Sequence, residues 1–355
     1  MILAFPAWRR GHFKATGGII TEALHRGHEV YLLHADDEKP GERVTANELR
    51  VRWPAAHIGN RHVADAVLGP SLHAYPDRLP AGRQYALDLA WENVTVPVGW
   101  KGHIYWASTY QREMWRRMNG REEGLVSLVW DNSITGSPMM DAFEQGGRST
   151  TLPREVYGRG PEPRPQIVLM ALKFPKNSGL WRRTWYRWIG YRAFVEALRR
   201  FSHRINAEFV IKTREKNDDP AWLRGLADTV MTDTALWPYS AAQVIQSAAY
   251  VVHFQSGAAL EAAFAGVPQL SVHLPHPHLR QYPGHQEQYE ASPGMQDWPG
   301  VVTGIGWESA IGYLDELMAV PTVDRIARSA YVARFLGFDD CKTSARILDL
   351  VERSG

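Results

Sequence analysis

The chain has almost no cysteine: of its 355 residues only Cys341 carries a thiol. A disulfide within the chain and a metal cluster held by thiolates are therefore excluded, and a reducing, cytoplasmic setting is expected. No apolar run is long enough to cross a membrane, and no basic leader precedes the first apolar residues, 2–5. Internal repeats and low-complexity tracts are also missing, so we expect an ordinary globular protein.

The net positive charge of the chain is small, but basic residues are concentrated in one region. The formal net charge is +2, which by itself does not indicate nucleic-acid binding. Residues 164–204, however, carry ten basic side chains against one acidic residue, Glu196. Aromatic residues recur there at helical spacing and are expected to pack in the core, which leaves the cations on other faces. Those cations could contact a polyanion such as nucleic acid, a teichoic-type polymer or a phospholipid surface.

Apolar residues make up 45% of the chain, and its length suits two Rossmann-like halves of roughly 150 residues each. The first half predicts strands at 2–5, 29–34, 103–107 and 125–130, and helices from about 13 to 26 and from 109 to 118. Between residues 36 and 100 the pattern is poor, and we expect loops around a helix near 84–91. Such loops commonly carry acceptor specificity.

A segment rich in Gly, Arg and Pro follows the first half, and we place the domain boundary there. The predicted domains are residues 1–144 and 166–355, joined by a linker at 145–165. The second half predicts strands at 166–172, 208–212, 249–254 and 269–272. Its expected helices lie at 181–203, 220–228, 241–248, 258–265, 307–318 and 341–352. Because strands and helices alternate, the fold class is α/β with parallel, doubly wound sheets.

The most informative segment is His253-Phe-Gln-Ser-Gly-Ala-Ala-Leu-Glu261. It predicts a buried strand, a glycine turn and a helix in direct succession. Free amides at Ser256, Gly257 and Ala258, together with the Ser256 hydroxyl, would face an anion at the positive end of the helix dipole, which suits a diphosphate. The Glu261 carboxylate, one turn further on, could accept hydrogen bonds from a ribose diol.

This segment resembles the donor-binding signature of GT-B glycosyltransferases, in which a histidine, a small-residue turn and a glutamate hold the phosphates and ribose. His253, Ser256, Gly257 and Glu261 match by position. The resemblance implies two Rossmann-like domains facing a cleft, the first binding the acceptor and the second the nucleotide sugar, with the last helix crossing back. The turn lacks the tryptophan and asparagine of the plant-type version and is closer to bacterial polysaccharide-type transferases. The donor base and sugar stay open, with UDP the expected nucleotide and no tightly bound cofactor.

Two segments of the first half extend the resemblance. The string at residues 135–141 is similar to the glycine, small residue, proline, aspartate crossing of epimerase-like and glycerophosphotransferase-like GT-B proteins. The pair Gly11-His12 stands where GT-B enzymes place a histidine in the interdomain cleft. His12 is our candidate general base, because inverting sugar transfer needs a group that takes the acceptor's proton and imidazole titrates near working pH. A donor-contact or loop-capping role for His12 is the alternative, and Asp36, Glu92 and Asp131 are candidate orienting carboxylates.

Cations are expected beside the leaving group and the acceptor. Lys212 and Arg214 end a buried strand at the edge where doubly wound sheets bind ligands, so either could neutralise the departing diphosphate. His273, His276 and His278 follow the next strand. Intervening prolines oppose ligand spacing, so we expect no metal there and a substrate contact from His276 or His278 instead. The residues expected to contact the acceptor or a polyanion are Arg9, Arg10, Lys14, Lys173, Lys176, Arg182, Arg183 and Arg187.

Three functions remain open. The leading hypothesis is a metal-independent glycosyltransferase that moves a sugar from a nucleoside diphosphate to an acceptor hydroxyl. The acceptor would be a cell-surface glycan or its lipid-linked precursor, or a hydroxymethylated base in phage-type DNA. A UDP-N-acetylglucosamine 2-epimerase-like isomerase is the second hypothesis, although residues 6–14 do not match the Gly-Thr-Arg-Pro-Glu-like loop of those enzymes. A noncatalytic nucleotide-sugar or nucleic-acid binding protein is the third.

Overall fold

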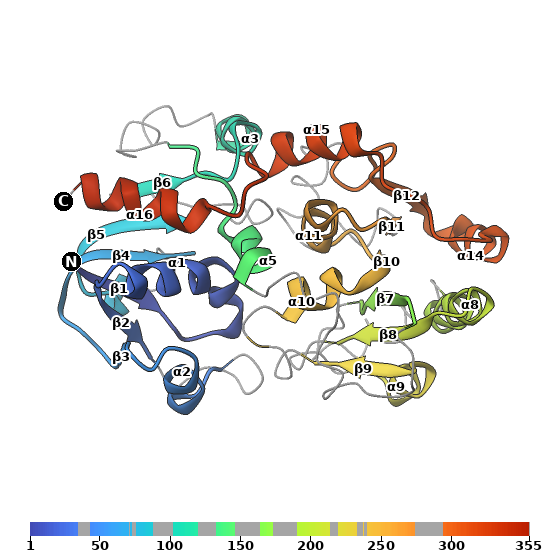
Figure 1. Ribbon diagram of the computed structural model, residues 1–355, viewed down its shortest axis with the longest axis horizontal. Helices are drawn as coiled ribbons and strands as arrows, with labels where there is room; N and C mark the ends of the chain where they lie inside the picture. The colour runs from blue at the N-terminus through green and yellow to red at the C-terminus, as the bar shows by residue number, and fades with distance from the viewer. Residues whose placement is uncertain are drawn as a thin grey trace. The chain divides into compact units, whose positions relative to one another are not determined.

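The computed structural model describes residues 1–34, 43–70, 72, 76–87, 102–119, 133–145, 164–172, 190–213, 219–232, 237, 240–273 and 294–354. Its internal contacts separate two compact units (Figure 1). The first unit comprises Met1–Gln145 together with Val332–Gly355, and the second comprises Gly146–Tyr331.

The first unit is built on a parallel six-stranded sheet with the order β3-β2-β1-β4-β5-β6. The central strand β1 pairs with β2 on one side and β4 on the other, and its residues from Leu3 onward are buried. The strands are β1 (Ile2–Pro6), β2 (Glu29–Leu33), β3 (His57–Ile58), β4 (Val63–Gly69), β5 (Ala81–Leu87) and β6 (His103–Tyr105). Parallel strands need crossover connections, and the helices between them supply these. The helical segments are η1 (Arg10–His12), α1 (Phe13–His25), α2 (Ala46–Arg52), η3 (Pro76–Arg78), α3 (Thr109–Asn119), η4 (Pro138–Asp141) and α5 (Ala142–Gln145).

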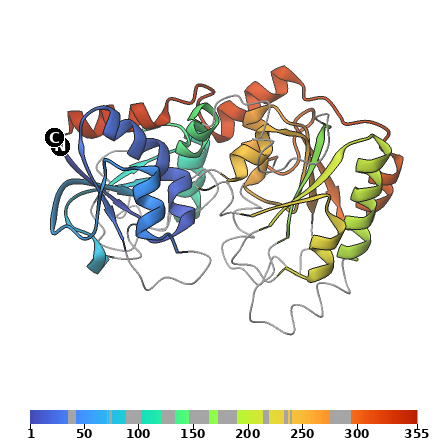
Figure 2. The same cartoon turned by 60° about the horizontal axis from the view of Figure 1, so that its bottom comes forward.

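The second unit repeats the design with a parallel sheet of order β12-β11-β10-β7-β8-β9. Its strands are β7 (Gln166–Met170), β8 (Glu208–Lys212), β9 (Thr229–Met231), β10 (Ala248–His253), β11 (Gln269–His273) and β12 (Val302–Gly306). The helices are α8 (Tyr191–Arg204), α9 (Ala221–Leu226), α10 (Ser240–Gln246), α11 (Ala258–Ala265) and α14 (Trp307–Glu316), and α15 (Arg325–Phe335) spans the division between the two units. Figure 2 shows helices on both faces of this sheet.

The core of the second unit follows the two-residue period of its strands. Alternate residues such as Ile167 and Leu169 of β7, and Tyr250 and Val252 of β10, pack against α8 and α14 in one buried cluster. The other face carries α10 and α11, which pack against each other. Because both faces are covered, the central strands of this sheet are mostly apolar, and the predicted α/β class with two doubly wound parallel sheets is confirmed.

Helix α16 (Thr343–Arg353) belongs to the first unit, and its first residues contact the segment 135–141. The buried Asp141 carboxylate accepts hydrogen bonds from the backbone N–H groups of Thr343 (3.1 Å) and Ser344 (2.5 Å). It thereby caps a helix whose own N-cap residue supplies no side-chain bond. Gly136 adopts a φ of +96°, and a Cβ there would lie 2.6 Å from the Thr343 hydroxyl. Burial raises the Asp141 pKa above its ordinary value, although the amides oppose that rise.

The region between residues 36 and 100 differs from the sequence expectation. Residues 81–87 form strand β5 where we expected a helix near 84–91. The segment reads as polar because its first half faces solvent and only Tyr85, Ala86 and Leu87 are buried. Three predicted parts lie wholly or partly outside the described residues: the strand at 125–130, residues 146–163 of the linker predicted at 145–165, and residues 181–189 of the helix predicted at 181–203.

Candidate functional site

The turn between β10 and α11 is the centre of the candidate site. The strand is buried because Val251 and Val252 lie in the middle of the sheet, and the helix begins at once because Ala258 to Ala265 are small and helix-forming. Gly266, with a φ of 70°, ends the helix in the left-handed conformation that glycine favours. The turn therefore lies at the carboxyl edge of the sheet, where α/β folds bind ligands.

Most of the turn's amides are already used. The Ser256 N–H points at the His253 Nδ1 atom (3.5 Å), and the Ala258 N–H donates to the Ser256 hydroxyl (3.3 Å). Of the three amides that we expected to be free, only that of Gly257 makes no hydrogen bond to a described residue. The sequence expectation of three free donors is thus corrected to one, because the turn folds back on its own histidine and serine.

The buried His253 ring contacts the backbone of this turn. Its ring is fully buried, and its Nε2 atom lies 2.8 Å from the Gln269 Oε1 atom. The Gln269 amide nitrogen in turn donates to the Ala259 carbonyl (3.0 Å). Burial lowers the His253 pKa to about 4; the hydrogen bond with Gln269 opposes this change, and His273 lowers the pKa further. The described contacts of this buried, neutral ring are thus with the Gln269 side chain and the Ser256 N–H, and a contact from His253 to the donor stays a prediction.

Glu261 is a buried acidic residue in the helix that follows the turn. Only 5% of the residue is exposed, and its carboxylate makes no hydrogen bond or ion pair with a described residue. A buried carboxylate without a partner is costly, so such groups are commonly reserved for a ligand. Its place in the first turn of α11 lets the helix dipole offset part of that cost.

Lys212 ends β8 at the same edge of this sheet. It is 5% exposed, and its Nζ atom donates to the Thr213 carbonyl (2.8 Å). Asp219 follows nearby: both its oxygens are shielded from solvent and make no hydrogen bond to any described residue. Burial raises the Asp219 pKa, whereas the charges of Arg224 and Lys212 lower it. A carboxyl group thus lies within electrostatic range of the expected phosphate-binding lysine.

A loop that the sequence did not single out supports the turn. Gln296 is 2% exposed, and its Nε2 atom donates to the Ser256 carbonyl (3.2 Å). Its Oε1 atom accepts from the Ser271 hydroxyl (2.8 Å), and its main-chain oxygen lies 3.0 Å from the His273 Nε2 atom. No local motif marks this glutamine, since its partners are 23 to 40 residues away.

In the first unit, His12 closes the short helix η1 and stands at the N-cap of α1. It is 9% exposed, and its ring meets the edge of Trp8 at a centroid distance of 6.0 Å. Its carbonyl accepts from the Thr16 hydroxyl (3.1 Å). The three candidate carboxylate partners, Asp36, Glu92 and Asp131, lie outside the described residues.

The basic residues next to His12 are partly engaged. The Arg10 guanidinium pairs with Glu48 at 2.7 Å, and the backbone of Arg9 bridges to that of Arg43. Lys14 lies half-buried in the first turn of α1. This loop therefore offers cations at the carboxyl end of β1, with one of them bound to a carboxylate.

Three of the described cations of the basic region are bonded to other residues of the second unit. On α8, Arg192 pairs with Glu196 (2.9 Å) and Arg200 with Asp315 (3.4 Å). Arg204 donates to two carbonyls at the end of α14. The remaining predicted cations and histidines lie outside the described residues: Lys173, Lys176, Arg182, Arg183, Arg187, Arg214, His276 and His278.

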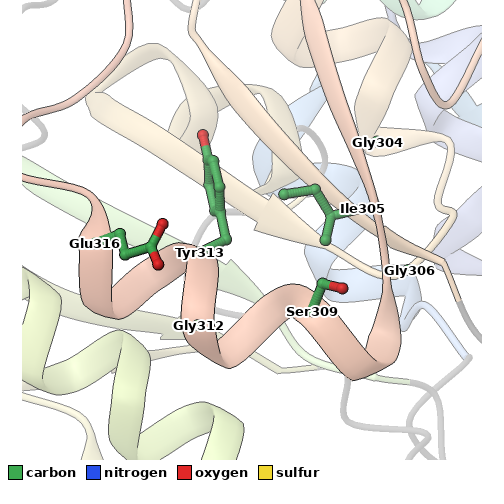
Figure 3. A pocket seen from close by; sticks show the side chains of 7 residues that line it. All are labelled: Gly304, Ile305, Gly306, Ser309, Gly312, Tyr313 and Glu316. Carbon is green, nitrogen blue, oxygen red and sulfur yellow. The ribbon is translucent and has the colours of Figure 1, made fainter.

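A hollow of about 550 Å³ opens elsewhere on the second unit, between edge strand β12 and helix α14 (Figure 3). Gly304 and Gly306 form its strand side, and Ser309, Tyr313 and Glu316 its helix side. None of the predicted site residues lines it. Within the described residues, no group of three or more His, Cys, Asp or Glu could hold a metal ion, and no helix is long and apolar enough to span a membrane.

Solved structures share this architecture. The S. aureus MnaA–UDP co-structure is 12% identical, covering 99% of this chain and 96% of its own, with a TM-score of 0.57. A putative UDP-N-acetylglucosamine 2-epimerase from Listeria monocytogenes is 12% identical over 99% and 96%, with a TM-score of 0.55. The wall teichoic acid polymerase TagF is 11% identical over 99% and 89%, with a TM-score of 0.56. No protein-family model and no curated protein matches the chain. These likenesses show the two-domain, GT-B-type fold.

Proposed function

We propose that the chain is a glycosyltransferase that takes a sugar from a nucleoside diphosphate, with UDP as the expected nucleotide, and transfers it to an acceptor hydroxyl. The observation that carries the proposal is Glu261, a residue that is 5% exposed and whose carboxylate has no partner among the described residues. It lies one turn into a helix that begins at the ligand-binding edge of a parallel sheet. A ribose diol would supply the two hydrogen bonds that this carboxylate lacks.

The diphosphate would occupy the start of α11. The Gly257 N–H and the positive end of the helix dipole favour an anion there. Lys212 and Arg214, at and after the end of β8, would offset the charge that develops on the departing diphosphate. These groups could carry the charge without a metal ion, so we expect activity to survive chelation.

The acceptor hydroxyl needs a base, and His12 is the residue that we propose for it. The fraction of His12 that stays exposed would have to face the acceptor. Arg9, Arg10 and Lys14 next to it favour an acceptor that carries phosphate, such as a cell-surface glycan or its lipid-linked precursor. Three of the α8 cations that suggested a DNA acceptor, Arg192, Arg200 and Arg204, are bonded within the protein, and no described contact favours hydroxymethylated DNA.

Isomerisation of the nucleotide sugar itself is the second candidate. It is favoured by the fold shared with structures named as UDP-N-acetylglucosamine 2-epimerases. Group transfer of another kind is represented by the TagF polymerase structures, two of them soaked with CDPG. Residues 6–14, Pro-Ala-Trp-Arg-Arg-Gly-His-Phe-Lys, do not match the epimerase loop, and for this reason we rank transfer above isomerisation.

The test is a mass-spectrometric turnover screen that pairs UDP-, CDP-, GDP-, ADP- and TDP-sugars with glycan, lipid-linked and hydroxymethylated DNA acceptors, with and without EDTA. Glu261→Gln should weaken UDP binding about 10- to 100-fold, since it removes charged hydrogen bonds to the ribose. Glu308→Gln is the matched control, because Glu308 also lies in the first turn of a helix of this unit but is exposed.

Each outcome of the screen decides between the candidates. A mass gain of one sugar on an acceptor, abolished by His12→Ala and Glu261→Gln, would support the transferase. An isomeric nucleotide sugar released without an acceptor would establish isomerisation instead. Nucleotide binding without turnover would leave a binding protein, and equal UDP affinity of Glu261→Gln and wild type would overturn the placement of the donor.

A further inference from the structure

Gln296 fixes the orientation of one peptide group in the turn between β10 and α11. The Ser256 carbonyl accepts two hydrogen bonds, one from the Ala259 N–H at 3.0 Å and one from the Gln296 side chain at 3.2 Å. That carbonyl and the Gly257 N–H belong to the same planar peptide unit, in which the C=O and N–H bonds point in opposite directions. Fixing the carbonyl therefore fixes the direction of the Gly257 N–H, the one turn amide without a described partner.

The Gln296 side chain itself has no freedom to turn. Its two polar atoms are both used, since Oε1 accepts from the Ser271 hydroxyl at the neighbouring strand β11 while Nε2 donates to Ser256. Rotating the amide by 180° would place Oε1 against the Ser256 carbonyl oxygen, and neither of these two oxygens can donate a hydrogen bond. Because the residue is 2% exposed, water cannot replace either partner easily.

The loop that carries Gln296 is anchored at both ends. The carbonyl of Met295 accepts a hydrogen bond from the buried Tyr331 hydroxyl of α15 (2.8 Å). On the other side, Trp298 and Val302 exchange two backbone hydrogen bonds of 2.9 Å each. The Gly304 N–H donates to the Asp297 carboxylate (3.1 Å). The glutamine thus projects from a braced hairpin and not from a free loop.

We infer that Gln296 is a positioning residue that aims the Gly257 N–H at a phosphate oxygen of the nucleoside diphosphate. The inference rests on the proposed function, because it names which amide meets the diphosphate and what orients it. A merely structural glutamine would contribute stability to the unit without setting the affinity for nucleotide.

The chain offers a matched control in Gln166, the first residue of β7. Its Oε1 atom also accepts from a serine hydroxyl, that of Ser247 (2.9 Å), and its Nε2 atom donates to the Glu208 carboxylate (3.0 Å). Gln166 lies at the amino end of the sheet, opposite the turn, because β7 begins there. Gln296→Met and Gln166→Met remove the same kinds of bond from the two ends of one sheet and keep the side-chain length.

Two measurements on the full-length protein test the inference. Hydrogen exchange followed by mass spectrometry should show the peptide containing residues 256–260 exchanging about tenfold faster in Gln296→Met, the size expected for one lost hydrogen bond with its buried partner left unpaired. Calorimetry with UDP should show about tenfold weaker binding by that variant. Gln166→Met should leave both quantities within twofold of wild type, and the acceptor KM should not change in either variant.

The outcomes separate the inference from the proposed function. If wild type binds UDP and Gln296→Met binds it equally well, the positioning role is overturned. If Gln166→Met weakens UDP binding as much as Gln296→Met does, the effect is general destabilisation and the inference fails. If wild type binds no nucleoside diphosphate of the panel, the proposed function fails, and selective exchange at residues 256–260 would then show that Gln296 still orders the turn.

Discussion

The buried ring of His253 predicts a specific loss of stability in acid. Burial holds its pKa at about 4 in the folded protein, against 6.5 for an ordinary histidine. A folded-state pKa that is depressed gives stability that is complete above pH 6.5 and is lost as the pH falls towards 4, because only the unfolded chain binds the proton in that window. At about 1.4 kcal/mol for each pH unit, the full loss is about 3 kcal/mol, and about 2 kcal/mol of it is already lost at pH 5.

The His253→Gln variant isolates this contribution. Glutamine can still donate to the Gln269 side chain but does not titrate, so the variant should lose about 1–3 kcal/mol at pH 7 and then show a flatter pH dependence than wild type. The difference in free energy of unfolding between wild type and variant should therefore shrink by about 2 kcal/mol between pH 6.5 and 5. His203→Gln, which removes a half-exposed ring from the same unit, controls for the loss of a histidine and should keep most of the acid-dependent decline.

The assay has to report on the second unit by itself, because a two-unit chain need not unfold in one step. Urea titrations at half-unit pH intervals, read by hydrogen exchange of peptides from β10 and β11, meet that need. Parallel stability curves for wild type and His253→Gln between pH 6.5 and 4.5 would refute the reasoning. They would mean that the folded state accepts the proton on this ring as readily as the unfolded chain does.

Two further predictions concern the support of the fold. Asp141→Ala should lower the free energy of unfolding of the first unit by about 2–4 kcal/mol, since it leaves two amides of α16 without a buried acceptor. Asp340→Ala removes the exposed ion pair with Arg346 and an exposed acceptor for the Lys342 N–H at the same helix, and it should cost under about 1 kcal/mol. Equal losses for the two variants in urea titrations would contradict the capping role. Gly304→Ala would place a Cβ 2.5 Å from the Asp297 side chain and should destabilise the second unit by about 1–3 kcal/mol. Gly312→Ala meets nothing within 4 Å and should stabilise α14 by up to about 1 kcal/mol, so a loss in thermal melts there would count against the argument.

The sequence was most informative where local composition and burial agree. The β10–α11 unit could be predicted because a β-branched apolar run is followed by a small-residue turn and an alanine-rich helix, and each of these has one favoured structure. Strand β8 was predicted with its observed bounds for the same reason. Both lie in the buried centre of the second sheet, where the strand must be apolar on both faces.

Prediction was poorest at sheet edges and in polar strands. Strand β5 begins Ala-Gly-Arg-Gln and has no apolar alternation, and Gly82 is required there because a Cβ would lie 2.3 Å from the Ala64 carbonyl. The three-residue strand β9 is too short to leave a period. Helix α15 is mostly exposed and arginine-rich, so its face towards the protein consists of a few residues such as Tyr331 and Phe335.

In the candidate site, too, the sequence predicts which residues are present but not which hydrogen bonds they make. The residues of the turn could be named from the sequence, but whether their amides were free could not, because that depends on the His253 ring and on Gln296, 40 residues further along. Two of the three expected donors are consumed inside the turn, which leaves the Gly257 amide. A diphosphate carries more charge than one amide and a helix dipole can offset. Metal-independent transfer would therefore depend on Lys212, so the proposed chemistry rests on a cation whose strand was predicted and an amide whose orientation was not.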